Sequence, residues 1–243
     1  MAFTLSVHAV TDRGLFRASN QDAIVVDGWF SQTQTGTLTC IAFPLERPTL
    51  VAVADGVGGN AAGDVASRIA LLELVAAHKG WTSTKAISDG LAAISTQIES
   101  IAERIGQQGM ATTIAGLAFG STSILSFNVG DSRVYRVTAD GVDQLSTDDV
   151  VPDEDGQPTH IITQCLGGSG ETPQPHLAEI PLAAGRYIVC SDGIHGVLTA
   201  SDIEAACHHI DGKDVAEKLI DTAIAHRTRD NYSLLVVDLA EAH

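Results

Sequence analysis

The spacing of apolar residues in this chain changes between that of β-strands and that of α-helices in blocks, and this order restricts the folds open to it. Strands are predicted where every second residue is apolar, at Leu5, Val7 and Ala9, and where an apolar run covers Leu50–Ala54. Two helices should follow, because apolar residues then recur at intervals of three and four. They are Val65, Ile69, Leu72 and Ala76 in the first helix and Ile87, Leu91, Ile94, Ile98, Ile101 and Ile105 in the second, which should end near Gly106.

The second half of the chain returns to strands from Thr112 to Leu145. Alternating Leu125, Phe127 and Val129, the turn sequence GDSR and the run Val134–Val137 together predict a β-hairpin. The segment Ser146–Thr159 is polar and acidic and contains Pro and Gly, which predicts a surface loop.

The C-terminal part mixes both spacings. Strand-like runs lie at His176–Ile180 and Tyr187–Cys190. Ser201 with Glu204 three residues later predicts a capping box that opens a helix. Another helix is predicted from Val215, Leu219 and Ala223, and a last strand from Ser233–Leu239.

This order of elements favours antiparallel sheets with helices packed outside them over alternating parallel units. A length of 243 residues is ordinary for one domain. We therefore expect residues 1–243 to form a single α+β domain.

The chain is strongly acidic, with 14 Lys+Arg, 30 Asp+Glu and a formal net charge of −16. This charge argues against binding nucleic acid or an anionic membrane through phosphate groups, and leaves basic partners and carboxylate-held cations open. No apolar stretch approaches the roughly 18 residues of a membrane span, and the N-terminus does not resemble a signal peptide. The scattered cysteines favour reduced thiols in a cytoplasmic protein; they are Cys40, Cys165, Cys190 and Cys207.

Aspartates stand beside the ends of the predicted strands. They are Asp22, Asp55, Asp131, Asp192 and Asp230. Carboxylates at strand ends can meet at one rim of a sheet, where they need raised pKa values or bound cations, and oxygen ligands suit Mg²⁺ or Mn²⁺. For one aspartate alone, a turn or a cap is the better interpretation; for five, each beside a predicted strand end, we favour a metal site, although spacing alone leaves both interpretations open.

Six short stretches resemble one known family, in the family's order. They are RASNQD at Arg17–Asp22, VAVADGVGG at Val51–Gly59, GMATTIAG at Gly109–Gly116, VGDSRVYR at Val129–Arg136, CSDGIHGVL at Cys190–Leu198 and RDNYSLLVV at Arg229–Val237. The family is the metal-dependent Ser/Thr protein phosphatases of type 2C, the PPM family, in its compact bacterial form. Each stretch is short, but six in one order make the resemblance specific.

The resemblance implies a four-layer α-β-β-α sandwich of two antiparallel sheets flanked by helix pairs. It also implies a centre of two Mn²⁺ or Mg²⁺ ions, with a third, weaker ion in bacterial members. The implied ligands are Asp55 bridging both metals, the Gly56 carbonyl on one of them, Asp192 and Asp230 on the other, Asp22 holding a water bound to a metal, and Asp131 with Asp192 at the third ion. Arg17 matches the arginine that grips the substrate phosphate, and its planar fork suits a dianion.

The implied reaction is hydrolysis of phosphoserine and phosphothreonine in proteins by water activated between the two metals. Arg17, Asp55 and Asp192 would be its catalytic residues. The implied partners are a phosphorylated protein and a cognate bacterial Ser/Thr kinase that the enzyme opposes in signal transduction. We expect a cytoplasmic monomer.

The chain departs from the family pattern at several positions. Val57 replaces a histidine proposed as general acid in many eukaryotic members, and Gln21 replaces a glutamate of some members. The segment Leu145–Cys165 is shorter than the usual flap region, which puts substrate preference in doubt. His160 and His195 are more simply interpreted as incidental.

Two other functions remain open. One is a non-catalytic PPM-like module that binds phosphoproteins without turnover. The other is a phosphatase of an anti-sigma antagonist, which the same site would serve. Retention of the five aspartates favours an enzyme, because a module without catalysis has no physical need to crowd carboxylates.

Overall fold

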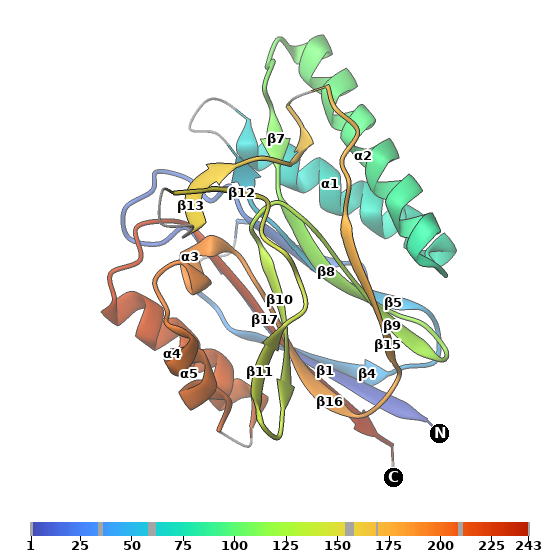
Figure 1. Ribbon diagram of the computed structural model, residues 1–243, viewed down its shortest axis with the longest axis vertical. Helices are drawn as coiled ribbons and strands as arrows, with labels where there is room; N and C mark the ends of the chain where they lie inside the picture. The colour runs from blue at the N-terminus through green and yellow to red at the C-terminus, as the bar shows by residue number, and fades with distance from the viewer. Residues whose placement is uncertain are drawn as a thin grey trace.

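Two six-stranded antiparallel sheets lie face to face in the computed structural model, which describes residues 2–33, 36–57, 62–153, 158–168, 170–208 and 211–242 (Figure 1). The first sheet has the order β11 (Gly141–Gln144), β10 (Arg133–Thr138), β16 (Gly185–Cys190), β17 (Tyr232–Glu241), β1 (Phe3–Asp12) and β4 (Thr39–Pro44). The second has the order β15 (His176–Pro181), β9 (Ser123–Val129), β8 (Ile114–Phe119), β5 (Thr49–Ala54), β2 (Ala23–Val26) and β3 (Trp29–Ser31).

The remaining elements of the described residues are two small sheets and the helices. A three-stranded sheet contains β14 (Leu166–Gly167), β7 (Ala111–Thr112) and β6 (Gly56–Val57), and a two-stranded ladder contains β12 (Val150–Pro152) and β13 (Pro158–Ile162). The helices are α1 (Gly63–Ala77), the 3-10 turn His78–Gly80, α2 (Thr84–Ile105), α3 (Asp192–His195), α4 (Ala200–Cys207) and α5 (Gly212–Ala225). None of the helices in this part of the chain is long and apolar enough to cross a membrane.

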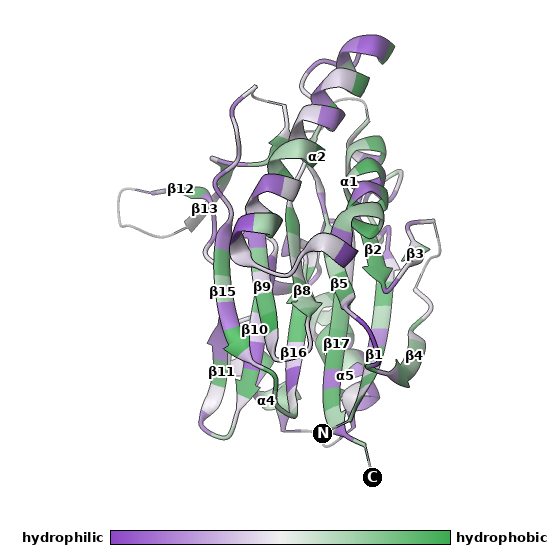
Figure 2. Ribbon diagram, turned by 90° about the vertical axis from the view of Figure 1, so that its right-hand side faces the viewer, coloured by the Kyte–Doolittle hydropathy of each residue, from purple (hydrophilic) through white to green (hydrophobic). Residues whose placement is uncertain are grey.

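Three apolar clusters separate four layers. The central cluster lies between the sheets and joins Leu5 and Leu235 of the first sheet to Ile24 and Val51 of the second. A second cluster packs the outer face of the second sheet against α1 and α2, and a third packs the outer face of the first sheet against α4 and α5. Because both faces are covered, all six residues of β5 are buried, which explains its continuous apolar run. Figure 2 shows this apolar character along the strands between the helix layers. The predicted α+β class is confirmed.

The second predicted helix is confirmed as α2. Its N-cap Ser83 accepts a hydrogen bond from the Ala86 N–H at 3.2 Å, and Gly106 ends it in the left-handed conformation. The predicted face is mostly correct, since Ile87, Leu91 and Ile98 are buried.

The predicted apolar face of α1 is only partly correct: Val65 and Ile69 are half-buried against the second cluster, but the fully buried stripe is rotated about the helix axis. The structure buries Ala66, Ala70, Leu71 and Leu74, whereas Leu72 is exposed. Small side chains allow close approach between a helix and its neighbours, so the alanines occupy the contact with the second sheet. The apolar residues are too numerous on α1 for spacing alone to select the buried stripe.

The predicted hairpin between residues 125 and 137 is also wrong. Strand β9 pairs with β8 and β15, whereas β10 pairs with β11 and β16 in the other sheet. The turn that contains Gly130, whose φ is +96°, therefore carries the chain across the sandwich. Alternation shows that a strand has two different faces, but it does not identify the sheet to which the strand belongs.

Two local predictions need correction. The capping box of α4 lies two residues before the predicted one: Thr199 Oγ1 accepts the Asp202 N–H at 3.1 Å, and the Asp202 carboxylate accepts the Thr199 N–H at 2.9 Å. This start places Ile203 on the buried side of the helix. The predicted loop Ser146–Thr159 contains β12 and the start of β13, while residues 154–157 lie outside the described residues.

The four cysteines are free thiols, as predicted. Strands at both ends of the chain are likewise confirmed: β1 pairs with β17 over their whole lengths, from Phe3↔Glu241 to Asp12↔Tyr232.

The rotation of α1 can be tested with two adjacent leucines. We expect Leu71→Ala to lower the free energy of unfolding by roughly 2–5 kcal/mol, because it leaves a cavity at a position that is 0% exposed. Leu72→Ala should cost about 0.5 kcal/mol or less, since that side chain is 51% exposed. Urea unfolding of the two variants measures both values, and equal losses would contradict the observed face.

Candidate metal centre

Two aspartates of the second sheet lie beside each other because of strand register. Asp22 directly precedes β2 and Asp55 directly follows β5. The two strands are antiparallel with Ala23 opposite Ala54, so the start of one lies next to the end of the other. The pairing therefore brings both carboxylates to one rim of the sandwich.

The first sheet supplies two more by the same geometry. Asp192 opens α3 just after β16 ends, and Asp230 lies just before β17 begins. Strands β16 and β17 are antiparallel with Cys190 opposite Leu234. Asp131 lies in the connection that crosses from β9 to β10, and thus between the two sheets.

A cavity of about 150 Å³ brings six of the seven predicted site residues together. Its lining includes Arg17, Asp55, Gly56, Asp131, Asp192 and Asp230. The seventh, Asp22, does not line the cavity; it is fully buried, and its Oδ2 accepts a hydrogen bond from Ser191 Oγ at 2.7 Å. Gly58, Gly59 and Asn60, which follow in the predicted glycine-rich turn, lie outside the described residues.

Gly56 occupies a position that excludes a side chain. A Cβ there would lie 2.5 Å from the backbone carbonyl of Gly63, the first residue of α1. The close approach keeps the backbone of β6 against the start of the helix, at the edge of the carboxylate cavity.

The carboxylates raise one another's pKa values. The pKa of Asp55 lies well above its ordinary value because of burial first and then the charges of Asp22 and Asp192, with Asp131 and Asp230 contributing less. Burial raises the pKa of Asp131 to about 7, with a further contribution from Asp192. The pKa of Asp192 is raised by burial and by Asp230, whereas a hydrogen bond with Asp55 acts in the opposite direction. The site therefore favours bound protons or bound cations over free carboxylates.

The donor atoms fit hard divalent cations. Asp22 Oδ1 and Asp192 Oδ1 are buried without a hydrogen-bond partner among the described residues. Oxygen donors of this kind suit Mg²⁺ and Mn²⁺. As placed, no group of three or more His, Cys, Asp or Glu side chains within the described ranges is gathered around one point for a metal ion. Arg17 also forms an ion pair with Asp230, so a cation has to compete with this guanidinium.

Comparison with known proteins identifies the family. The family model for protein phosphatase 2C matches residues 19–226. The chain belongs to the protein phosphatase 2C family. The chain is 27% identical to the serine/threonine protein phosphatase PstP of Mycobacterium tuberculosis, a match that covers 99% of this chain and 46% of PstP. It thus spans less than half the length of that relative. It is 26% identical to the protein phosphatase PhpP of Streptococcus pneumoniae, with 98% of each chain covered.

Solved structures give the same fold for this phosphatase 2C chain. The catalytic domain of PstP in complex with two manganese ions has a TM-score of 0.76 at 26% identity, covering 98% of this chain and 100% of that domain. The phosphatase Stp1 of Staphylococcus aureus has a TM-score of 0.79 at 22% identity, covering 98% of this chain and 95% of that one, and at this identity it supports the fold alone.

Sequence reasoning missed Asn231, which holds the Arg17 segment against the carboxylates. Its Nδ2 donates to the carbonyls of Arg13 at 2.8 Å and Ser19 at 2.9 Å, and its Oδ1 accepts the Gln21 N–H at 2.8 Å. Its position directly after Asp230, in the sequence RDN, could have indicated that it lies at the site. The amide fixes both ends of the loop that carries Arg17.

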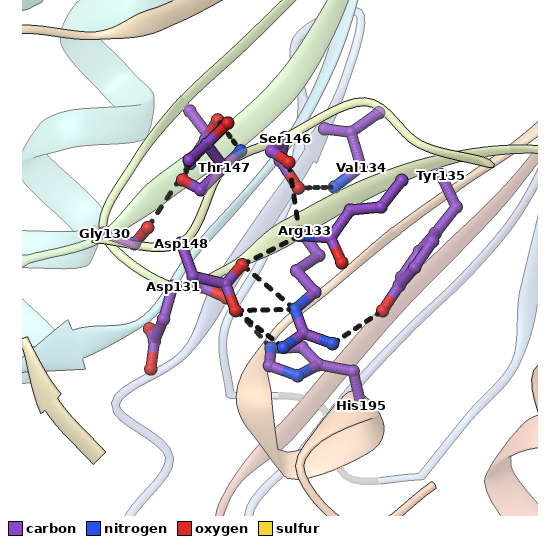
Figure 3. A network of polar contacts seen from close by, with 11 residues as sticks. Gly130, Asp131, Arg133, Val134, Tyr135, Ser146, Thr147, Asp148 and His195 are labelled. Atoms are coloured by element: carbon purple, nitrogen blue, oxygen red, sulfur yellow. Dashed lines mark hydrogen bonds and ion pairs between the residues drawn. The ribbon is translucent and has the colours of Figure 1, made fainter. Parts of the chain in front are cut away.

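The two histidines interpreted as incidental both lie at the site. His160 lines the carboxylate cavity. His195 Nε2 donates to the backbone carbonyl of Asp131 at 2.9 Å (Figure 3). Burial and the nearby Arg133 lower the pKa of His195 to about 3, so the ring is neutral. It therefore links α3, which begins with Asp192, to the turn that holds Asp131.

An ion pair fixes the other side of that turn. Arg133 donates to Asp148 at 2.6 Å through Nη2 and at 3.0 Å through Nε, and its Nη1 donates to the Tyr135 hydroxyl at 3.0 Å (Figure 3). Both ion-pair partners are largely buried, so this contact is better shielded from solvent than a surface pair.

Metal-free protein should lose stability as the pH rises. Burial raises the pKa of Asp22 from 3.8 to about 7, so the folded state keeps a proton that the unfolded chain releases. Raising the pH from about 5 to about 8 therefore favours unfolding, by roughly 2–3 kcal/mol for this group alone. Urea unfolding with chelator across this range measures the slope.

Asp22→Asn should reduce that slope, because the amide does not titrate. Asp143→Asn on exposed β11 makes the same charge change away from the cavity and serves as the control. Saturating Mn²⁺ should raise the melting temperature of the wild type more at the higher pH, since protons then compete less for the carboxylates. A slope equal in wild type and Asp22→Asn would contradict this account.

Proposed function

We propose that this chain is a metal-dependent protein Ser/Thr phosphatase that hydrolyses phosphoserine and phosphothreonine in proteins. The observation that supports this best is the convergence of Asp55, Asp131, Asp192 and Asp230 with Arg17 on one cavity. The family membership and the manganese-bound structure of the PstP catalytic domain support the same proposal. So does the mutual repulsion of the buried carboxylates, which bound cations would offset.

The proposed ligand set is the one that the family resemblance implies. Asp55 would bridge two divalent cations, Mn²⁺ or Mg²⁺, and the Gly56 carbonyl would bind one of them. Asp192 and Asp230 would bind the other, and Asp131 with Asp192 a third, weaker ion. Asp22, which is fully buried and does not line the cavity, would hold a water bound to a metal. When bound, the cations would lower the pKa of a water nucleophile and offset phosphoryl charge.

The protein's own groups bind and orient the substrate. Arg17 lies at the mouth of the cavity with its side chain 47% exposed, where it can exchange its ion pair with Asp230 for the phosphoryl group. Asn231 holds the ends of the loop that carries it, so the guanidinium is positioned in advance. Val57 offers no proton to the leaving group at the edge of the cavity.

The wider assignments also belong to this proposal. Residues 1–243 would form a single catalytic domain. Its substrate would be a phosphorylated protein, and a bacterial Ser/Thr kinase would add the phosphate that it removes. We propose that it acts as a monomer in the cytoplasm.

Asp55→Asn and Asp192→Asn should abolish Mn²⁺-dependent hydrolysis of p-nitrophenyl phosphate and of a phosphothreonine peptide, because each removes a proposed metal ligand. We expect a loss of at least about 10²-fold in kcat/KM. Circular dichroism should show a retained fold, and Asp143→Asn is the matched control. Near-normal turnover by either variant would refute the ligand assignment, and wild type inactive at confirmed metal occupancy would favour the non-catalytic binding module.

Arg17→Ala should mainly raise KM for phosphopeptides, by roughly 10- to 100-fold, because it removes charge-assisted hydrogen bonds to the phosphoryl group. Arg17→Lys should recover part of this loss, since it restores the charge without the planar fork. Steady-state kinetics of the three proteins measures the effect. An unchanged KM in Arg17→Ala would remove Arg17 from the proposed substrate site.

A further inference from the structure

A second cavity of about 530 Å³ adjoins the carboxylate cavity. The two share Arg17, His160, Asp192 and Asp230. The second extends along Gly193, Gly196, Val197, Arg227, Thr228 and Arg229. We call this extension, from Gly193 to Val197 and from Arg227 to Arg229, the arginine groove.

The groove is basic in a chain of net charge −16. Arg227 and Arg229 lie on either side of Thr228, and both are exposed. The acids that border the groove, Asp192 and Asp230, are the proposed metal ligands. If metal ions neutralise these two carboxylates, the charged side chains left in the groove are those of Arg227 and Arg229, so a bound molecule meets positive charge.

The guanidinium N–H donors of Arg227 and Arg229 are free to bind a ligand. Within the described residues, neither side chain forms a hydrogen bond or an ion pair with another protein group. Arg229 instead lies over the ring of Phe16, with its Cζ 5.4 Å from the centroid. Phe16 is itself exposed, as is Leu15, so an apolar edge adjoins the basic groove.

Arg227 stands in a backbone conformation that favours glycine. It follows α5 with a φ of +59°, its N–H donates to the Ile224 carbonyl at 2.9 Å, and the Thr228 N–H donates to the Ala223 carbonyl at 3.0 Å. This is the Schellman arrangement, whose left-handed position is usually glycine. An arginine in this left-handed conformation costs conformational strain energy that a glycine would avoid, and it places a cationic side chain at the groove.

The segment that carries Arg227 is held firmly on both sides. Thr228 Oγ1 donates to the Gly193 carbonyl at 2.7 Å, and a His226 ring nitrogen lies 2.9 Å from the Val197 carbonyl. Both carbonyls belong to α3 or the turn after it. The backbone at Arg227 is thus held in place next to the carboxylate cavity, so binding a ligand there does not require this segment to become ordered.

From this arrangement we infer that the arginine groove binds an anionic side chain near the phosphorylated residue, so that phosphoproteins acidic around the phosphosite are preferred substrates. The inference rests on the proposed phosphatase function. The planar forks of Arg227 and Arg229 suit a carboxylate or a second phosphate. A substrate whose phosphoryl group meets Arg17 would place the residues next to it along the groove, because Arg17 lines both cavities.

The test compares kcat/KM, with Mn²⁺, for phosphothreonine peptides of one sequence. One peptide has neutral flanks, a series carries an aspartate at each neighbouring position in turn, and a matching series carries a second phosphothreonine. Wild type should favour the best anionic peptide over the neutral one by about two- to fivefold, the range of an exposed ion pair. The two series distinguish a carboxylate from a phosphate as the preferred anion.

Three variants locate the preference. Arg227→Asn keeps a residue that tolerates positive φ but removes the charge, so its anionic-to-neutral ratio should fall toward one. Arg227→Lys should retain most of the ratio. Arg104→Asn, on the exposed last turn of α2, makes the same change in net charge outside both cavities and should keep the wild-type ratio.

A wild-type ratio of one with every anionic peptide would overturn the inference. The inference would also be overturned if Arg227→Asn kept the wild-type ratio and only lowered the melting temperature. Arg227 would then only stabilise the C-terminal end of α5. An equal loss in Arg104→Asn would assign the preference to net charge. The same anionic-to-neutral ratios can be measured as Kd values by fluorescence anisotropy, using Asp55→Asn, which should not hydrolyse the peptides. Asp55→Asn is then compared with the double variants that also carry Arg227→Asn, Arg227→Lys or Arg104→Asn. These binding measurements test the groove even if the chain has no turnover, which separates this inference from the proposed function.

Discussion

The pairing of β2 with β5 and of β16 with β17 is the constraint on which the candidate site depends. Each pair places the end of one strand beside the start of the other, and an aspartate follows or precedes each of these ends. A slip of one residue would turn each strand's buried side chains to the opposite face. The central cluster prevents this, because Ile24, Val53 and Leu235 are fully buried between the sheets. The position of the carboxylates is thus set by apolar packing some distance from them.

That packing holds the carboxylates in an electrostatically unfavourable arrangement. All four other aspartates raise the pKa of Asp55, and two buried carboxylate oxygens have no hydrogen-bond partner within the described ranges. Such a site is destabilising until protons or cations occupy it. Two divalent cations would change the formal net charge from −16 to −12, since −16 + 4 = −12. Most of the chain's negative charge therefore lies elsewhere on the surface, and only a small part defines the site.

The sequence supports predictions best where one physical rule acts alone. Aspartates beside strand ends and the regular isoleucines of α2 are of this kind, and so are the strands β1, β5 and β17. It fails where several arrangements satisfy the same rule. Strand β9 alternates equally well whether it pairs with β10 or with β8, and the acidic residues near position 200 offer two overlapping capping boxes. The roles of His195 and Asn231 arise from contacts between segments distant in sequence, which no local pattern encodes.

Close packing around Gly193 explains how an acidic centre and a basic groove can adjoin each other. A Cβ at Gly193 would lie 1.9 Å from the Asn231 carbonyl, so only glycine lets α3 rest directly on the start of β17. The Gly193 carbonyl in turn accepts the Thr228 hydroxyl at the end of α5. Asp192, Asp230 and Arg227 are therefore carried by segments in direct contact, and none of the three can shift without disturbing that packing. Residues proposed to bind metal and those proposed to bind the substrate's flanking charge share one rigid support, which fixes their relative positions before any ligand arrives.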